Sequence, residues 1–134
     1  MLDPEETDEL VARALREDLG GGEDVTTAAT IPAEALTVAV MRARKPGILC
    51  GVDCAVAAFC KVDPMLVVDV LARDGAALSA GQDILRISGS ARGILTAERT
   101  ALNFVTHLSG IATLTDQYVQ AVAGTGAAIM CTRK

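Results

Sequence analysis

Residues 94–123, ILTAERTALNFVTHLSGIATLTDQYVQAVA, form the longest stretch of one periodicity in this chain of 134 residues. Its apolar residues recur at the spacing of a helix face; they are Leu95, Leu102, Val105, Leu108, Ile111, Leu114 and Val119. Glycine costs about 1 kcal/mol relative to alanine inside a helix, so Ser109-Gly110 predicts a kink or break. The stretch therefore predicts a long helix that is interrupted near its middle.

Upstream of this helix, short β-branched stretches alternate with turn formers, which is typical of strands. Leu36–Ala43 and ILCGV (48–52) are expected to form a hairpin around KPG (45–47). MLVVDVLARDG (65–75) predicts a further strand, and DGAALSAGQDILRISGS (74–90) predicts turns, a short extended piece and a final strand. We expect one sheet of about four strands.

Two shorter helices and one last strand complete the expected elements. TDELVARALRED predicts an amphipathic helix from about Pro4 to Asp18, ended by the glycines at 20–22, and residues 20–34 are expected to form a loop. CAVAAFCKV (54–62) predicts a short helix capped by Asp53. After the long helix, AAIMC (127–131) has the apolar character of a buried strand.

Composition indicates an α/β protein with an aliphatic core, because 51% of residues are hydrophobic but only 2% are aromatic. Charges interrupt every apolar run and the acidic start lacks a basic signal region, so we expect a cytoplasmic protein without a membrane partner. Residues 1–24 hold nine acids and two arginines, which disfavours a nucleic-acid partner. The cysteines lack metal-site spacing and are expected to be buried thiols; they are Cys50, Cys54, Cys60 and Cys131.

The first candidate site lies in TAERTALN (96–103), where Arg99 and Asn103 are four residues apart and share a helix face. An arginine presented there suits a carboxylate or phosphate, because the guanidinium is a planar fork of donors. The alternative is a solvated surface pair between Glu98 and Arg99. The residue pattern alone leaves both interpretations open.

The second candidate site is Thr132-Arg133-Lys134, directly after the apolar run. In parallel α/β barrels the active site is built at the carboxyl ends of the strands, so two cations and a hydroxyl there would bind an anion. The alternative is a solvated basic pair. This candidate site depends on whether the preceding segment is a barrel strand.

Three further features are weaker candidates for a functional site. The pattern DGxxLxxG within 74–81 is similar to that of biotinyl and lipoyl carrier domains, but no lysine lies between Lys61 and Lys134 to be modified. The single histidine, His107, is interpreted as a packing or capping residue of the long helix. The stretch Asp24–Thr27 is expected to cap or brace the fold.

Several motifs, taken in order, resemble the quinolinate phosphoribosyltransferase family. They are REDLGGGEDVTT, RARKPGILCGVD, DGAALSAGQDILRISGSARGILTAERTALNFVTHLSGIATLT and CTRK, and they cover nearly the whole chain from about Arg16 onward. The resemblance implies an N-terminal α/β sandwich over residues 1–110. Residues 111–134 would then form a connecting helix and the first strand of an incomplete α/β barrel.

The resemblance also implies an activity. Members of this family join quinolinate to phosphoribosyl pyrophosphate with Mg²⁺ and release pyrophosphate and CO₂, giving nicotinate mononucleotide for NAD synthesis. Arg99 matches the arginine that contacts quinolinate in a neighbouring subunit, so a homodimer with shared sites is expected. Thr132, Arg133 and Lys134 match residues that line the substrate pocket of their own barrel.

The sequence departs from the family pattern in two ways. Cys131 precedes the Thr-Arg-Lys triplet at a position where an acid is often expected. The Mg²⁺ and phosphoribosyl ligands of the family are expected beyond Lys134, so we expect this chain alone to be an inactive fragment. The alternatives are a related nicotinate-type or molybdenum-linked phosphoribosyltransferase, or a non-enzymatic dimerising domain.

Overall fold

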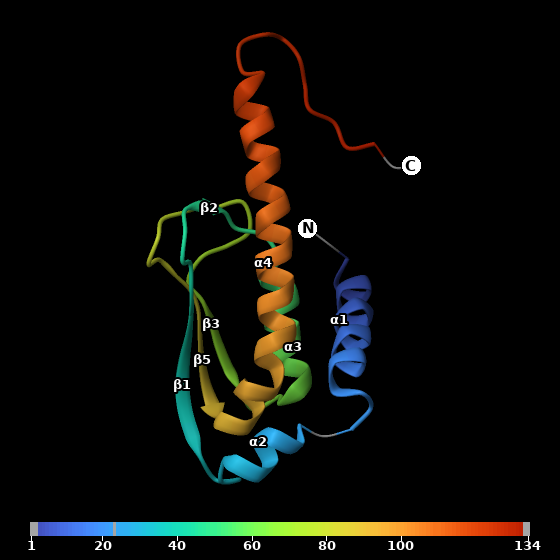
Figure 1. Cartoon of the computed structure of the whole chain (residues 1–134), viewed down its shortest axis with the longest axis vertical. Helices are drawn as coiled ribbons and strands as arrows, with labels where there is room; N and C mark the ends of the chain where they lie inside the picture. The colour runs from blue at the N-terminus through green and yellow to red at the C-terminus, as the bar shows by residue number, and fades with distance from the viewer. Residues whose placement is uncertain (1–2, 23, 133–134) are drawn as a thin grey trace.

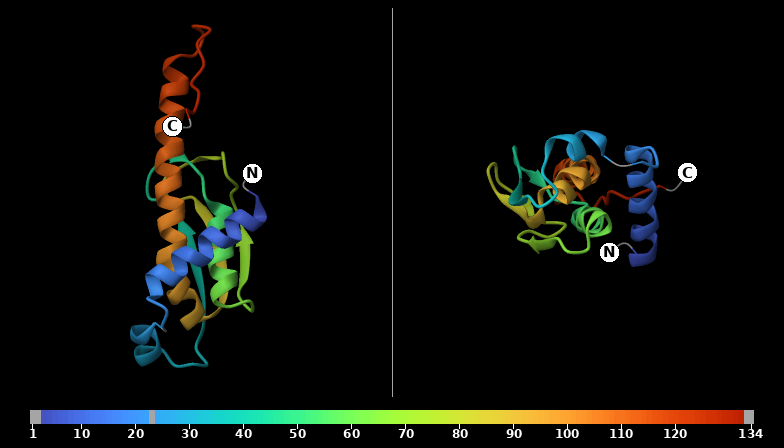
Figure 2. Two further views of the ribbon diagram at one scale, coloured as in Figure 1. Left: turned by 90° about the vertical axis from the view of Figure 1, so that its right-hand side faces the viewer. Right: turned by 90° about the horizontal axis from the view of Figure 1, so that it is seen from below.

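The computed structural model describes residues 3–22 and 24–132 and places them in three layers. A small antiparallel sheet forms the first layer, and α3 (Val52–Val62) and α4 (Ala91–Ala121) cover one of its faces. The third layer is α1 (Pro4–Leu19), which packs on the far side of α3 and α4 (Figures 1 and 2). The expected α/β class, a mixture of helices and sheet, is confirmed.

Helix α1 begins and ends as its sequence indicates. The Oδ1 atom of Asp3 accepts a hydrogen bond from the backbone N–H of Glu5 at 2.8 Å, which caps the helix start before Pro4. Gly20 ends the helix in the left-handed conformation, with φ of 59°. Between these ends, Val11 and Leu15 are buried and anchor α1 on the inner helices.

The main sheet has three strands in the order β1-β5-β3. These are β1 (Leu36–Arg42), β5 (Asp83–Ser90) and β3 (Val67–Val70), and both outer strands run antiparallel to β5. A second sheet pairs β2 (Gly47–Ile48) with β4 (Ala77–Leu78).

The predicted hairpin between 36–43 and 48–52 is therefore wrong, and one four-stranded sheet becomes two smaller ones. β1 pairs with the distant β5 because that strand supplies Leu85 and Ile87, which are 0% and 2% exposed, to the same core face. Strand pairing follows the burial of a common face rather than proximity along the chain.

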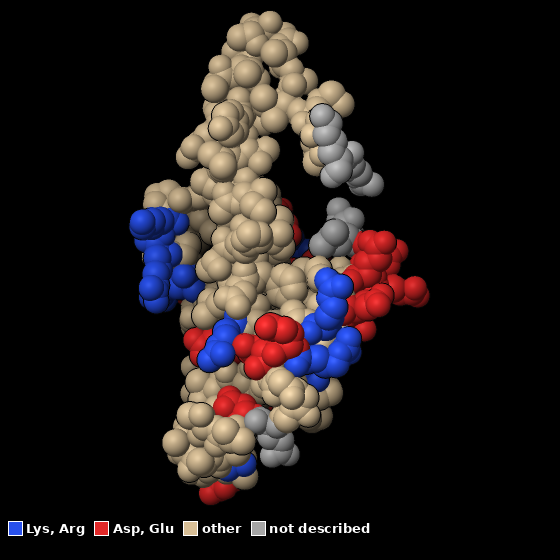
Figure 3. Space-filling view, turned by 45° about the vertical axis from the view of Figure 1, so that its right-hand side comes forward, with Lys and Arg blue, Asp and Glu red and all other residues tan. Residues whose placement is uncertain are grey.

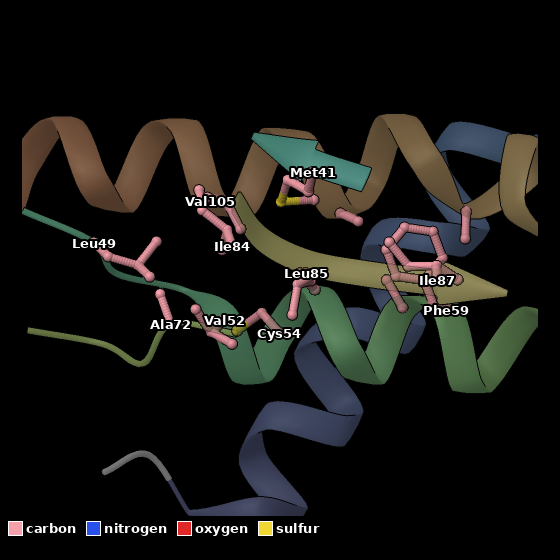
Figure 4. Packing of buried hydrophobic residues seen from close by; sticks show 14 of the residues in the cluster. Met41, Leu49, Val52, Cys54, Phe59, Ala72, Ile84, Leu85, Ile87 and Val105 are labelled. Atoms are coloured by element: carbon pink, nitrogen blue, oxygen red, sulfur yellow. The ribbon is translucent and has the colours of Figure 1, made fainter. Parts of the chain in front are cut away.

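The core lies between the sheet and the two inner helices (Figure 4). Leu49, Leu85 and Ile87 are among its largest fully buried side chains, and Phe59 of α3 lies beside Ile87. Alanines at the contact between α3 and α4 have no exposed surface; they are Ala55, Ala58, Ala97 and Ala101. Their small side chains let the two helices approach closely, which explains how an alanine-rich chain fills its interior.

Helix α4 is continuous over 31 residues, so the predicted interruption at Ser109-Gly110 is wrong. The Ser109 hydroxyl donates to the carbonyl of Cys50 at 3.1 Å and accepts from the N–H of Cys50 at 2.9 Å. These contacts with the neighbouring loop hold the helix straight at the position where glycine would weaken it.

The start of α3 is capped from a distant turn rather than by Asp53. The carboxylate of Asp74 accepts from the N–H of Gly51 at 3.0 Å and from the N–H of Val52 at 2.9 Å. Asp53 lies in the first turn of the helix, two residues after the cap position, Gly51. Asp74 therefore links the β3–β4 connection to α3.

The segment predicted as a loop over 20–34 contains a short helix, α2 (Val25–Thr30). The Oδ1 atom of Asp24 accepts from the N–H of Thr27 at 3.0 Å and caps this helix, as the bracing interpretation of Asp24–Thr27 predicts. Arg92 of α4 fastens its other end by donating to the carbonyls of Ala28 and Ile31 at 2.9 and 2.7 Å. A helix of six residues depends on such contacts because it is too short to be stable alone.

Two smaller expectations also fail. Residues 127–132 form no strand, so the predicted apolar strand over 127–131 is not observed. Of the cysteines, Cys54 is buried and Cys50 partly so, whereas Cys60 and Cys131 are exposed. Burial raises the pKa of the Cys54 thiol, which therefore packs as a small neutral side chain.

In the described ranges, no helix combines the length and apolarity that crossing a membrane requires.

Candidate functional site

Arg99 lies in the first half of α4, beside the last turn of α1. Its Nη1 donates to Oδ1 of Asp18 at 3.2 Å. The Arg99 side chain is 75% exposed, whereas that of Asp18 is only 19% exposed. One nitrogen of the guanidinium is thus held by a half-buried carboxylate while most of the group faces outward.

The partner of Arg99 differs from the one considered from the sequence. Glu98 is exposed, and the ion pair that the structure shows for Arg99 is made with Asp18, 81 residues earlier. The interpretation as a pair between neighbouring residues of one helix is therefore wrong. Sequence reasoning missed Asp18, although an acid in the last turn of a helix is itself a signal because the helix dipole disfavours it there.

A small pocket of about 180 Å³ opens between the guanidinium and the start of α2. Its polar lining consists of Asp18, Asp24, Thr96 and Arg99. Asp24 accepts from the hydroxyls of Thr27 and Thr96 at 2.5 and 3.5 Å. The hydrogen bonds from Thr27 lower the pKa of Asp24, so its carboxylate stays ionised at neutral pH.

Arg99, Asn103 and His107 are spaced four residues apart and form a polar strip along α4. Asn103 and His107 line a larger pocket of about 810 Å³ between α1 and α4, and Asp18 lines both pockets. His107 is exposed, so its expected role in packing or capping is not what the structure shows. The floor of the larger pocket is apolar, with Leu10, Ala14 and Phe104.

Of the second candidate site, the structure describes only Thr132, and it does not bring that residue to Arg99. Thr132 is exposed in the segment that follows α4, and Arg133 and Lys134 lie outside the described residues. The end of α4 at Ala121 lies about 33 Å along the helix axis from Arg99. After α4 the chain turns back and descends apart from the helix, at the level of its upper half (Figure 1), whereas Arg99 lies in the first half of α4.

A third pocket, of about 540 Å³, is lined by the cations Arg16, Lys61 and Arg92. Lys61 pairs with Asp8 at 2.7 Å, and Arg92 donates to the carbonyls at the end of α2. These last two cations are engaged in holding helices together. Arg99 is likewise engaged by Asp18, whereas Arg16 is exposed, so exposure and engagement alone do not rank this pocket below the one beside Arg99.

The described residues do not fit the expected metal. In the ranges 3–22 and 24–132, no three His, Cys, Asp or Glu side chains gather closely enough to hold an ion. The two acids near Arg99 are already engaged, Asp18 by the guanidinium and Asp24 by hydroxyls and the cap of α2. We therefore assign no step at this site to Mg²⁺.

The DGxxLxxG pattern has a structural role in this fold. Its Asp74 caps α3, and its Leu78 is buried in β4. The pattern therefore serves the packing of the second sheet and the start of α3.

Known proteins share this architecture and sequence. The nicotinate-nucleotide pyrophosphorylase (carboxylating) of Mycobacterium leprae is 49% identical over 126 residues, which span 92% of this chain and 44% of that protein. The chloroplastic counterpart in Arabidopsis thaliana is 42% identical over 93% of this chain and 35% of its own length. The chain thus spans less than half the length of these curated relatives.

Solved structures agree with the fold. The nicotinate-nucleotide pyrophosphorylase from Francisella tularensis superposes with a TM-score of 0.84 at 32% identity, over 92% of this chain and 44% of that one. NadC from Streptococcus pyogenes gives a TM-score of 0.86 at 36% identity, over 91% of this chain and 43% of that one.

The sequence model for the family described as quinolinate phosphoribosyl transferase, N-terminal domain, matches residues 24–109. This match covers β1 to β5 and the half of α4 that carries Arg99. The chain therefore belongs to the quinolinate phosphoribosyl transferase family, and the part of the family that it matches is the N-terminal domain.

Proposed function

We propose that this chain supplies the N-terminal domain of an enzyme that makes nicotinate mononucleotide from quinolinate and phosphoribosyl pyrophosphate, releasing pyrophosphate and CO₂. The observation that carries the proposal is the exposed guanidinium of Arg99, tethered at one nitrogen within the family-matched region. Residues 1–110 would form the sandwich domain and residues 111–134 the connection to the catalytic part.

The proposed chemistry explains the need for such a group. The pyridine nitrogen of quinolinate attacks the anomeric carbon of the ribose as the bond to pyrophosphate breaks. The resulting pyridinium then stabilises the carbanion left when the adjacent carboxylate departs as CO₂, and a proton replaces that carboxylate. A substrate with two carboxylates and a co-substrate with several phosphates must be held together, so cations and orientation dominate catalysis.

Arg99 suits the carboxylates of quinolinate because its fork can donate two parallel hydrogen bonds. Its side chain points away from the core and is 75% exposed, so it is available to a surface outside its own domain. This supports a homodimer in which Arg99 enters the partner's active site. Thr132, Arg133 and Lys134 would line the pocket of their own subunit, and Mg²⁺ would accompany the phosphates of the co-substrate.

The test is a chimera in which the full 134-residue chain replaces the matching part of the Mycobacterium leprae relative. Release of CO₂ from quinolinate in the presence of phosphoribosyl pyrophosphate and Mg²⁺ is measured. We expect turnover, and we expect Arg99→Ala to reduce kcat/KM by about 100-fold because a donor to a reacting carboxylate is lost. Arg44→Ala removes another exposed arginine, at the far end of β1, and is the matched control.

The outcomes separate the two parts of the proposal. A folded chimera without turnover would remove the assigned reaction. Turnover that Arg99→Ala leaves unchanged would keep the reaction and remove Arg99 from the site. Loss in both Arg99→Ala and Arg44→Ala would indicate a general effect of positive charge rather than a specific contact.

A further inference from the structure

We propose that Asp18 is a positioning residue for Arg99, holding Nη1 so that the remaining donors of the guanidinium face the dicarboxylate substrate. The inference rests on the proposed function. It assigns a role to a residue of α1, outside the family-matched range 24–109. The contact that carries it is the 3.2 Å hydrogen bond between Arg99 and Asp18.

The location of Asp18 is the first argument. It lies in α1 one residue before Leu19, the last residue of the helix, where the unpaired carbonyls give a partial negative charge. The helix dipole disfavours a carboxylate at that position. A cation next to the carboxylate offsets this repulsion, and Arg99 is the cation that the structure places there.

The rigidity of the support is the second argument. Leu15 is 7% exposed and Val11 is 0% exposed, so the half of α1 before Asp18 is anchored in the core. Gly20 then turns the chain in the left-handed conformation directly after the helix. Asp18 is thus a fixed carboxylate on a packed element, which is the kind of support that holds a functional side chain in one orientation.

The asymmetry of exposure is the third argument. An ion pair with one partner 75% exposed contributes little to stability, because solvent screens it and long side chains lose freedom. Its effect is on the arginine itself, whose many rotamers are reduced to those that keep Nη1 at Asp18. The donors Nε and Nη2 remain free of the ion pair and are available for a planar carboxylate.

The test uses the chimera that contains the full chain and measures KM for quinolinate and for phosphoribosyl pyrophosphate, together with kcat. We expect Asp18→Ala to raise KM for quinolinate about threefold by releasing Arg99, and to leave KM for phosphoribosyl pyrophosphate unchanged. Asp18→Asn keeps an oxygen acceptor for Nη1 and is expected to recover part of the loss. In the Arg99→Ala background, Asp18→Ala should have no further effect.

Asp8→Ala is the matched control, because it breaks a second ion pair of α1, between Asp8 and Lys61 at 2.7 Å. This variant should leave both KM values unchanged. Equal effects of Asp8→Ala and Asp18→Ala would show that any loosening of α1 has the same result, and would overturn the assignment.

Two further results would overturn the inference while keeping the proposed function. One is an unchanged KM for quinolinate in Asp18→Ala and Asp18→Asn while Arg99→Ala raises it. The other is an additive effect of Asp18→Ala and Arg99→Ala, which would show that Asp18 acts without Arg99. If Arg99→Ala itself has no effect, it is the proposed role of Arg99 that fails. If the Asp18→Ala variant does not fold, KM for quinolinate in the Asp18→Asn variant is the deciding measurement.

Discussion

The two halves of α4 have similar helical patterns but opposite surroundings. From Ala91 to Val105 the helix has seven buried residues, whereas from Ile111 onward none is buried and Leu114 and Tyr118 are 54% and 58% exposed. In Figure 3 the upper part of the helix shows no charged side chain on the visible face. A helical apolar stripe therefore predicts the helix, but the neighbouring elements determine which part of the stripe is buried.

Replacing isoleucine in each half would test this difference most strongly. Ile94 is 4% exposed and Ile111 is 52% exposed. Ile94→Ala is expected to lower the free energy of unfolding by about 2–5 kcal/mol, because it leaves a cavity in the core. Ile111→Ala should change it by less than about 0.5 kcal/mol. Urea unfolding of both variants provides the comparison, and equal losses would show that the second half is covered in solution.

Glycines near each half offer a second test. Gly51 has φ of +98°, and an added Cβ would lie 3.1 Å from the carbonyl oxygen of Phe104 in α4. Gly51→Ala should therefore reduce the free energy of unfolding by about 1–3 kcal/mol through backbone strain and crowding. Gly110 has open space around it, so Gly110→Ala should raise stability by about 1 kcal/mol. A destabilising Gly110→Ala would mean that this glycine has a contact of its own.

Hydroxyl contacts at the start of the second half give a smaller effect. Oγ1 of Thr113 accepts from the N–H of Ile48 at 2.8 Å, whereas Thr115 donates to the carbonyl of Ile111 in its own helix. Thr113→Val should cost about 1 kcal/mol and speed amide hydrogen exchange at Ile48, because that N–H loses its partner. Thr115→Val is the isosteric control, and faster exchange at Ile48 in both variants would contradict the assignment.

The smallest effect is expected in the buried half. Thr100 is 3% exposed, and within residues 3–22 and 24–132 its hydroxyl has no hydrogen-bond partner. Thr100→Val exchanges that hydroxyl for a methyl group of similar size, so we expect thermal unfolding to show a gain of about 0.5 kcal/mol. A loss of stability would indicate that a water or ligand group satisfies the hydroxyl in solution.

The features that follow from local pattern could be predicted from the sequence. Helix α1 was expected to end near Asp18 and ends at Leu19, and β1 was expected over Leu36–Ala43 and spans Leu36–Arg42. In both cases the signals, a glycine run and a β-branched stretch, lie within the element itself. Arg99 could be singled out by its residue type and helix face, and its role in binding a substrate stays a prediction.

The features that depend on distant partners could not be predicted in this way. The pairing of β1 with β5, the cap of α3 by Asp74 and the ion pair of Arg99 with Asp18 each join residues more than 20 positions apart. The local propensity of a segment does not show which distant residue will cap its helix, pair with its strand or contact its exposed face. The six residues of α2 were missed for a related reason, because their helix exists through contacts with Arg92.

The strand order β1-β5-β3 has a consequence for synthesis of the chain. The central strand, β5, is the last of the five to leave the ribosome, and β1 and β3 have no partner in the main sheet until Asp83–Ser90 has been made. During that interval, two apolar strands with open edges are available for pairing with other chains. A nascent copy is thus most prone to aggregation while residues 36–82 have been made and β5 has not. Synthesis of β5 gives both strands their partner and ends this interval.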